Sequence, residues 1–404
     1  MVIKRNRREA RQYAFQMLYA NEFHVDQSDV QFPEGHMHKS MDKAYANNII
    51  NGVLSASEII DAALQPFCKS RKVENLDKVD RAILRIALWE MTNEDEPLEP
   101  SIAINEAIQL AKDFGSDSSY KLINAILDAY NKRNMVFQHT KALPKLISEL
   151  PQLPISGIGV SGFPRREENS YMPAFMVGLG YGQSLSHMMN VPLHVFAHQE
   201  NHILAALREL KTIPSEPFLA LHLSGGTTEL VYCHYKGEGI FDSHIIGGSK
   251  DLQGGQYVDR IGVAMGLPFP AGKHLEALAL QTTEYEPLPS SVKEGWISFA
   301  GPCSAAMRRI SDSMNDTEKS NLARAVFTSI GNALEKMITY HLQNKPVQTL
   351  IAVGGVMSNS LLRHRMEQYC RRNHLTLHVA QPQFSVDNAT GNAFGAAFLQ
   401  ETRG

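Results

Sequence analysis

The chain has 404 residues, of which 43% are hydrophobic and 20% charged, and its formal net charge is −3. This length exceeds one typical domain, so we expect two or three domains of an ordinary soluble globular protein. No apolar run approaches the roughly 18 residues of a membrane span, and the basic N-terminus lacks the apolar core of a signal peptide. The four cysteines are scattered without paired spacing, which favours reduced thiols and a cytoplasmic location.

Residues 1–134 are predicted to form an all-α helical bundle. Apolar side chains recur at helical spacing in four segments, at residues 10–18, 79–87, 104–111 and 122–130. Such stripes indicate helices that bury one face against each other. The polar stretch "NKRNMVFQHTK" follows, and after it the pattern of apolar residues is no longer that of a helical bundle. We therefore expect a multidomain protein with a boundary between residues 134 and 135.

Basic residues gather at the start of the chain. Five of the first eleven residues are Lys or Arg, against the single acid Glu9. Guanidinium groups at such a start can contact RNA phosphates and bases. A solvated, charged helix face explains the same charges equally well.

The region 135–404 has the pattern of an α/β domain. Short apolar strands end in glycine turns and lead into helices, as in "FLALHLSGG", "TLIAVGGVMSNSLLRHRM" and "TLHVA". This alternation is typical of an α/β fold.

The stretch "AHQENHILAAL" places His198 and His202 four residues apart on a predicted helix. Positions i and i+4 share one helix face, so both imidazoles could reach one metal ion. A zinc protease carries its glutamate base directly after the first histidine. Here Gln199 occupies that position, and Glu200 lies about 200° around the helix from His198. The metalloprotease interpretation is therefore poor, whereas another kind of metal site needs a third ligand.

Two turns could take part in a nucleotide site, and a third places an aspartate before a helix. The backbone N–H groups of Ser224, Gly225 and Gly226 could face phosphate oxygens, although a plain hairpin is the simpler interpretation. Asn359 follows Gly354-Gly355 and opens a predicted helix, which helix capping explains equally well. Asp387 precedes a small-residue helix, and there too an N-cap is the simpler interpretation.

Three blocks in the first region carry a family resemblance. In chain order they are "RREARQYAFQMLYA", "VDRAILRIALWEM" and "SIAINEAIQLAKDFGSDSSYKLINAILDAY". Together they resemble the NusB family of transcription antitermination factors. The resemblance implies binding of boxA-like RNA alongside NusE, and it carries RNA contact onto Arg5, Arg7, Arg8 and Arg11. The polar segment "HVDQSDVQFPEGHMHKSMDK" departs from the family, where a helix would be expected.

The second region resembles the TsaD family, related to proteins once called glycoproteases. The motifs, in order, are the two histidines with Glu200, "SGGT", "DLQGGQYVDRIGVAMGLPFPAGKHLEALA", "GGVMSNSLLR" and "SVDNATGNA". The family transfers a threonylcarbamoyl group from its adenylate to a tRNA adenosine. Its fold is that of the actin-like and sugar-kinase-like ATPases, and TsaB- and TsaE-like proteins are its expected partners.

Matching motif to motif implies two sets of site residues. His198, His202 and Asp387 would hold one divalent ion, iron or zinc. An adenine nucleotide or threonylcarbamoyl-adenylate would contact His222, Leu223, Ser224, Gly225, Gly226, Asp259, Gly272, Glu276 and Asn359. Glu276 stands where the family usually has aspartate, so we expect a lengthened contact there.

The chain also departs from the TsaD family. The family's opening strand hairpin is missing, so we expect a fold truncated in its first lobe. Gln256 and Arg260 replace glutamate and lysine, and Thr227 replaces histidine. Three interpretations stay open: an RNA-binding transferase whose activity is reduced or lost, a non-catalytic metal- and nucleotide-binding module on an RNA-binding regulator, and, least favoured, a metalloprotease.

Overall fold

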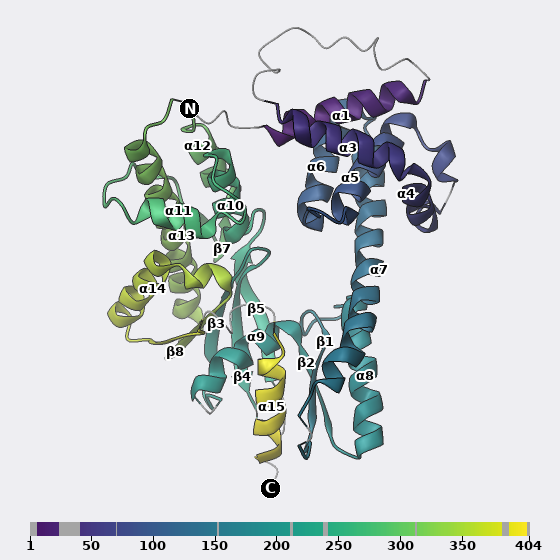
Figure 1. The fold of residues 1–404 in the computed structure, drawn as a ribbon. Coiled ribbons are helices and arrows are strands. Elements are labelled where there is room, and N and C mark those ends of the chain that lie inside the picture. Colours follow the sequence, from purple (N-terminus) through teal and green to yellow (C-terminus); the bar gives the residue numbers. More distant parts are fainter. Residues whose placement is uncertain are drawn as a thin grey trace. The chain divides into compact units, whose positions relative to one another are not determined.

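The structure is a computed structural model that describes residues 6–23, 41–69, 71–151, 153–210, 213–236, 241–311, 313–381 and 388–401. Arg5, Asp387 and most of the polar segment after residue 23 lie outside the described residues. The chain divides into two compact units, Met1–Ser148 and Glu149–Gly404, coloured along the sequence in Figure 1. The predicted boundary after residue 134 falls inside the last helix of the first unit, α7 (Ser119–Ser148).

Unit 1 is all-helical, as predicted. Its helices are α1 (Arg7–Asn21), α3 (Lys43–Ser55), α4 (Ser57–Leu64), α5 (Lys78–Thr92), α6 (Pro100–Phe114) and α7, with short 3-10 turns at Gln65–Phe67 and Val73–Asn75. The predicted apolar stripes form the core, where Ala14, Ile83 and Ile123 are fully buried. Leu122 is an exception, since it is 38% exposed beside the buried stripe of α7.

Unit 2 is built on a seven-stranded mixed sheet, and the α/β prediction is confirmed. In spatial order the strands are β6 (Ser291–Lys293), β7 (Trp296–Ser298), β5 (Phe241–Ser249), β4 (Thr228–Tyr235), β3 (Phe218–Leu223), β8 (Thr349–Val353) and β9 (Thr376–Val379). The strand β3 is antiparallel to β4 and parallel to β8. Its side chains alternate between the two faces, so Leu219 and Leu221 enter one core cluster and Phe218 and Ala220 another.

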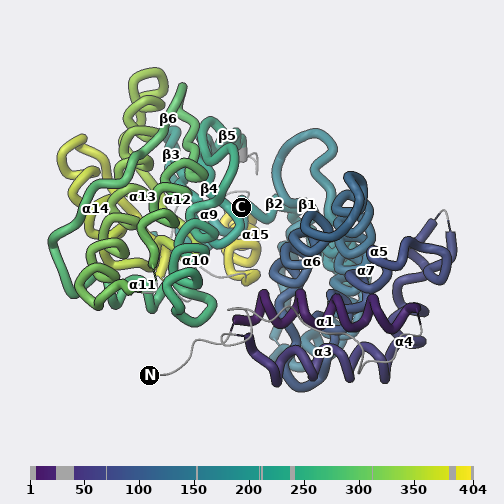
Figure 2. The backbone as a smooth tube through the Cα atoms, turned by 90° about the horizontal axis from the view of Figure 1, so that it is seen from above, coloured from purple at the N-terminus to yellow at the C-terminus, as the bar shows by residue number. Residues whose placement is uncertain are grey.

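Helices cover both faces of this sheet, as Figure 2 shows from above. One core cluster includes residues of α10 (Gly254–Ala264), α11 (Gly272–Ala279), α12 (Ala300–Met307), α13 (Asp316–Asn344) and α14 (Ser360–Arg372). The other includes residues of α9 (His198–Leu207) and α15 (Thr390–Glu401). No helix in the described ranges combines the length and apolarity needed to cross a bilayer.

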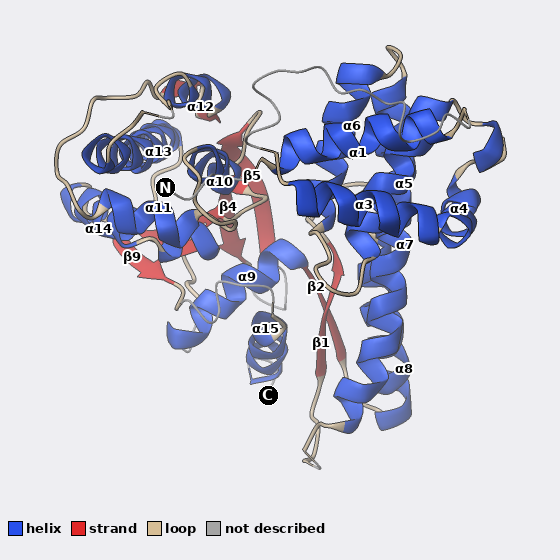
Figure 3. Cartoon of the chain, turned by 45° about the horizontal axis from the view of Figure 1, so that its top comes forward, coloured by secondary structure: helices blue, strands red, loops and turns tan. Residues whose placement is uncertain are grey.

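A second, smaller sheet lies beside α15, drawn in red in Figure 3. It consists of the parallel strands β1 (Ile158–Phe163) and β2 (Leu193–Ala197), joined by the crossover helix α8 (Pro173–Met189). Within the described residues this sheet has these two strands alone, in keeping with the predicted truncation. The strand β2 leads directly into α9, so the small sheet sets the position of the two candidate metal ligands.

Candidate nucleotide and metal site

The two histidines of α9 point their ring nitrogens at a common region. The Nε2 atoms of His198 and His202 lie 3.2 Å apart. Two imidazole nitrogens bound to one tetrahedral zinc ion, each at 2.0–2.1 Å, would lie about 3.3 Å apart. The pair therefore fits the donor spacing of a shared ion. Among the residues that the structure describes, no three His, Cys, Asp or Glu side chains form a complete metal site.

His222 lies next to this pair. It sits on β3, is 7% exposed, and its ring centroid lies 4.9 Å from that of His202. The family resemblance implied that His222 contacts the nucleotide, whereas in the fold its ring contacts the candidate metal ligand His202. A third imidazole at this position adds a nitrogen donor of the kind that zinc and iron accept.

Glu200 has a structural environment. Its side chain is fully buried. The two carboxylate oxygens accept from the guanidinium of Arg166 at 2.5 and 2.7 Å, and one also accepts from the Ala197 N–H at 2.8 Å. A buried carboxylate whose two oxygens are engaged by an arginine and a backbone N–H serves a structural pair and is not placed to act as a protease base. This geometry agrees with the poor match to a metalloprotease.

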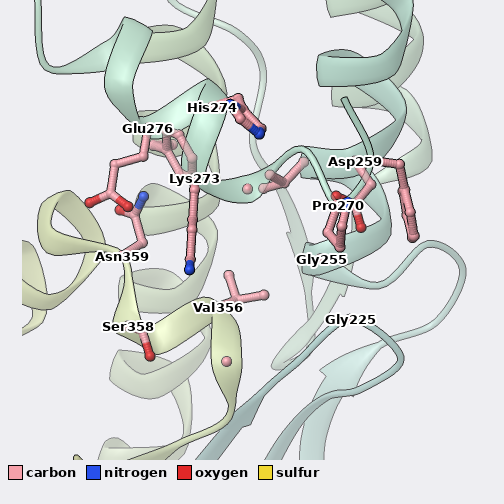
Figure 4. A pocket seen from close by; sticks show the side chains of 15 residues that line it. Gly225, Gly255, Asp259, Pro270, Lys273, His274, Glu276, Val356, Ser358 and Asn359 are labelled. Atoms are coloured by element: carbon pink, nitrogen blue, oxygen red, sulfur yellow. The ribbon is translucent and has the colours of Figure 1, made fainter. Parts of the chain in front are cut away.

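A cavity of about 550 Å³ gathers several of the predicted nucleotide-binding residues (Figure 4). Gly225, Asp259, Gly272, Glu276 and Asn359 line it, although they come from four separate segments. The predicted residues His222, Leu223, Ser224 and Gly226 are not among its lining residues. The turn that contains Gly225 is closed by the Ser224 N–H donating to the Thr227 carbonyl at 2.8 Å, so the simpler hairpin interpretation also holds.

Bare backbone faces this cavity at three glycines. A Cβ atom added at Gly225, Gly272 or Gly355 would meet nothing within 4 Å. Gly255 differs, because a Cβ there would lie 2.5 Å from the Cα of Gly225. Gly255 thus lets α10 approach the hairpin turn, whereas the other three leave room for a ligand.

Two carboxylates of the cavity have different surroundings. The Asp259 Oδ1 atom accepts from the Ala271 N–H at 2.8 Å, and burial raises the pKa of this carboxyl above its usual value. The Glu276 Oε1 atom accepts from the N–H and the hydroxyl of Ser360 at 2.7 and 2.6 Å. The extra methylene of glutamate therefore lets residue 276 bond to the start of α14.

Asn359 lines the cavity, and the two polar atoms of its side chain have different surroundings. Its Oδ1 accepts from the Leu362 N–H at 3.0 Å and caps α14. Its Nδ2 is buried and has no hydrogen-bond partner within the described part of the chain, while the residue is 6% exposed. Buried donors without partners are rare in folded proteins. A ligand oxygen or ring nitrogen would satisfy this one.

Sequence reasoning missed Lys273 and Ser358, which also line the cavity. Lys273 extends into it in Figure 4. Its place directly after the predicted residue Gly272 is the one signal that could have indicated it. Ser358 carries no such signal, because its position depends on the turn before α14.

The N-terminal arginines of unit 1 have unequal surroundings. Arg7 and Arg8 are 44% and 57% exposed and pair with Glu96 and Asp113 at the surface. The side chain of Arg11 is 6% exposed and donates to Glu90 at 2.7 Å. Its buried position differs from the surface contact expected from the sequence, because the carboxylate of Glu90 draws it into the bundle.

Comparisons with known proteins match the two units separately, first the helical unit and then the α/β unit. Residues 171–394 match the family model "tRNA N6-adenosine threonylcarbamoyltransferase", and residues 8–132 match that of the NusB family. The chain belongs to the tRNA N6-adenosine threonylcarbamoyltransferase family and carries a NusB domain in front of the matching region.

A curated relative and two solved structures share parts of the chain. The probable bifunctional tRNA threonylcarbamoyladenosine biosynthesis protein of Methanothermobacter thermautotrophicus is 28% identical over 277 residues. That match covers 67% of this chain and 49% of the relative, so the chain spans about half the relative's length. T. maritima NusB is 28% identical with a TM-score of 0.27, covering 32% of this chain and 92% of that one. Full-length HypF is 14% identical with a TM-score of 0.43, covering 58% and 38%.

Proposed function

We propose that unit 2 binds an adenine nucleotide or threonylcarbamoyl-adenylate in the cavity lined by Asp259, Gly272 and Asn359. The observation that carries this proposal is that Asn359 lines a cavity edged by bare glycine backbone, while its buried Nδ2 lacks a partner among the described residues. Of the remaining predicted contacts, Ser224 and Gly226 belong to the turn beside Gly225, and His222 and Leu223 end the strand β3. Asp259 is proposed to accept from a ribose hydroxyl.

One divalent ion, iron or zinc, is proposed to bind through His198, His202 and Asp387. The 3.2 Å spacing of the two Nε2 atoms supports the first two ligands. Such an ion supplies Lewis acidity for the carbonyl of a bound threonylcarbamoyl group. The chain's own residues hold the imidazoles in place, because α9 is buried along almost its whole length.

The reaction proposed for the family site is transfer of the threonylcarbamoyl group to a tRNA adenosine. Turnover by this chain alone is proposed to be low or absent, since a closed first lobe is needed to orient the reactants and exclude water. Gln256 also cannot act as a carboxylate base. TsaB- and TsaE-like proteins are the proposed partners of this chain. Unit 1 is proposed to bind boxA-like RNA with NusE, through the exposed Arg7 and Arg8 and through Arg5.

The hydrogen bonds between Glu276 and Ser360 favour the non-catalytic alternative. They use an oxygen of this carboxylate to hold the start of α14. One experiment separates the two. On a single preparation, AMP and ATP affinity is measured by calorimetry, and modification of unmodified tRNA is assayed with threonylcarbamoyl-adenylate, with and without TsaB- and TsaE-like proteins. Nucleotide binding without modification under either condition supports the binding module. Efficient modification by the chain alone contradicts the proposed low turnover.

A further inference from the structure

We propose that a groove between α13 and α14 binds the phosphate backbone of the RNA substrate. This inference deepens the proposed function and rests on it. The groove consists of two cavities of about 460 and 510 Å³ that share Glu335 and Arg372 as lining residues. The first cavity also shares Phe327 with the nucleotide cavity. The three cavities therefore lie in succession, and the groove leads away from the nucleotide site.

Positive charge is in excess along this groove. Arg324, Arg365 and Arg372 line the first cavity, and Glu335 is the one acidic residue among its described lining residues. Arg365 and Arg372 both pair with Glu335, at 2.8 and 3.5 Å, so one carboxylate serves two cations. Arg324 has no ion pair within the part of the chain that the structure describes. An anion is the ligand that such a lining favours.

The three arginines differ in how firmly they are held. Arg365 crosses α13 at Gly331, where an added Cβ would lie 2.4 Å from its Cδ atom, and it donates to Asn332 at 2.6 Å. Arg365 thus forms part of the groove wall. The side chain of Arg372 is 63% exposed, and that of Arg324 forms no ion pair with any residue that the structure describes. These two guanidinium groups can turn to bind phosphate oxygens bidentately.

The length of the groove favours a nucleic-acid strand over a small anion. Its lining residues on α13 run from Arg324 to Gln343, which spans about 28 Å at 1.5 Å per residue. Tyr340 lines the far cavity and is 40% exposed. An exposed aromatic ring beside a cationic groove is a platform on which an unpaired base can stack.

The test uses the full chain with Arg7→Ala and Arg8→Ala, so that unit 1 contributes little to RNA binding. In this background, Arg324→Ala with Arg372→Ala is compared with a control, Arg363→Ala with Arg371→Ala. The control removes the same charge from exposed residues of α14 that do not line the groove. Arg365 is left unchanged because it packs against Gly331. Dissociation constants for a tRNA anticodon stem-loop are measured from 0.05 to 0.3 M salt.

The groove variant is expected to bind the stem-loop about tenfold more weakly at 0.1 M salt, with the log–log salt slope smaller by about 1.4 for two lost phosphate contacts. The RNA affinity and the salt slope of the control variant should change little. Equal losses in both variants, or no loss in either, would overturn the proposal. Loss of poly-glutamate binding with RNA affinity unchanged would assign the groove to an acidic protein segment instead. AMP affinity, measured alongside, separates the two proposals: if the parent chain binds no AMP, the proposed function itself fails.

Discussion

His198 and His202 lie one turn apart on α9, with their Nε2 atoms separated by 3.2 Å. This spacing requires a helix over these residues, because four residues advance the chain by about one turn. It also requires both side chains to adopt converging rotamers in a buried helix.

Replacing either histidine should remove the metal. We expect purified protein to hold about one iron or zinc ion per chain, whereas His198→Ala and His202→Ala retain little on reconstitution. Metal content by mass spectrometry is the measurement. His364→Ala, an exposed histidine of α14, is the control and should keep its metal. A His198→Ala protein with undiminished metal content would exclude the site.

Two substitutions at Asn359 should separate its role in helix capping from its role in ligand binding. Asn359→Ser keeps an oxygen that can cap α14 but removes the Nδ2 donor, so we expect weaker AMP binding at nearly unchanged stability. Asn359→Ala removes both atoms and should in addition destabilise the protein by about 1 kcal/mol. Calorimetric AMP binding and urea denaturation measure the two effects. Equal AMP affinity in the wild type and the serine variant would argue against the Nδ2 contact.

AMP binding should depend on pH through Asp259. Burial raises the pKa of this carboxyl, so its ionised form is disfavoured in the free folded protein. The stability that the carboxyl contributes is therefore greatest below its unfolded pKa of about 3.9 and declines as pH rises through the raised folded pKa. A ribose hydroxyl donates to the ionised form, so AMP affinity should rise across that raised pKa and then level off. In Asp259→Asn this rise should disappear, whereas an unchanged profile would assign the titration to another group.

Arg11 should matter for stability. Arg11→Met leaves the buried Glu90 without its cationic partner, which typically costs about 3–5 kcal/mol. The double variant with Glu90→Leu should recover most of that loss. Urea denaturation followed by Trp89 fluorescence, in a Trp296→Phe background, reports on unit 1. Arg8→Met, at an exposed pair, should cost about 0–1 kcal/mol. If Arg11→Met costs no more than Arg8→Met, the buried pair is not important for stability.

Arg7 and Arg8 should matter for RNA. Changing both to alanine is expected to weaken binding of boxA-like RNA and to flatten its salt dependence, because two phosphate contacts are lost. Fluorescence anisotropy over a salt series is the measurement. Lys121→Ala with Arg133→Ala, two charges elsewhere on unit 1, serves as the control. Affinity that stays unchanged in the Arg7 and Arg8 variant would contradict the RNA surface.

The sequence alone determined the class of each unit and the helix that carries the histidines. Apolar periodicity predicts a buried helix face directly, because Ile83 and Ile123 must leave water whichever partners they meet. The order of the motifs likewise indicated Asp259, Gly272 and Asn359 before their segments could be placed together.

The tertiary structure decided what each polar side chain contacts. Arg8 and Arg11 look alike in a basic stretch, yet Arg11 is buried because α5 brings Glu90 to it. The carboxylate of Glu200 pairs with Arg166, which lies in the loop after β1. The ring of His222 on β3 contacts the ring of His202 on α9. A charge or an imidazole has no preferred partner along the chain, since its energy depends on the burial and the neighbours that distant segments supply. For that reason these contacts could be read only from the folded chain.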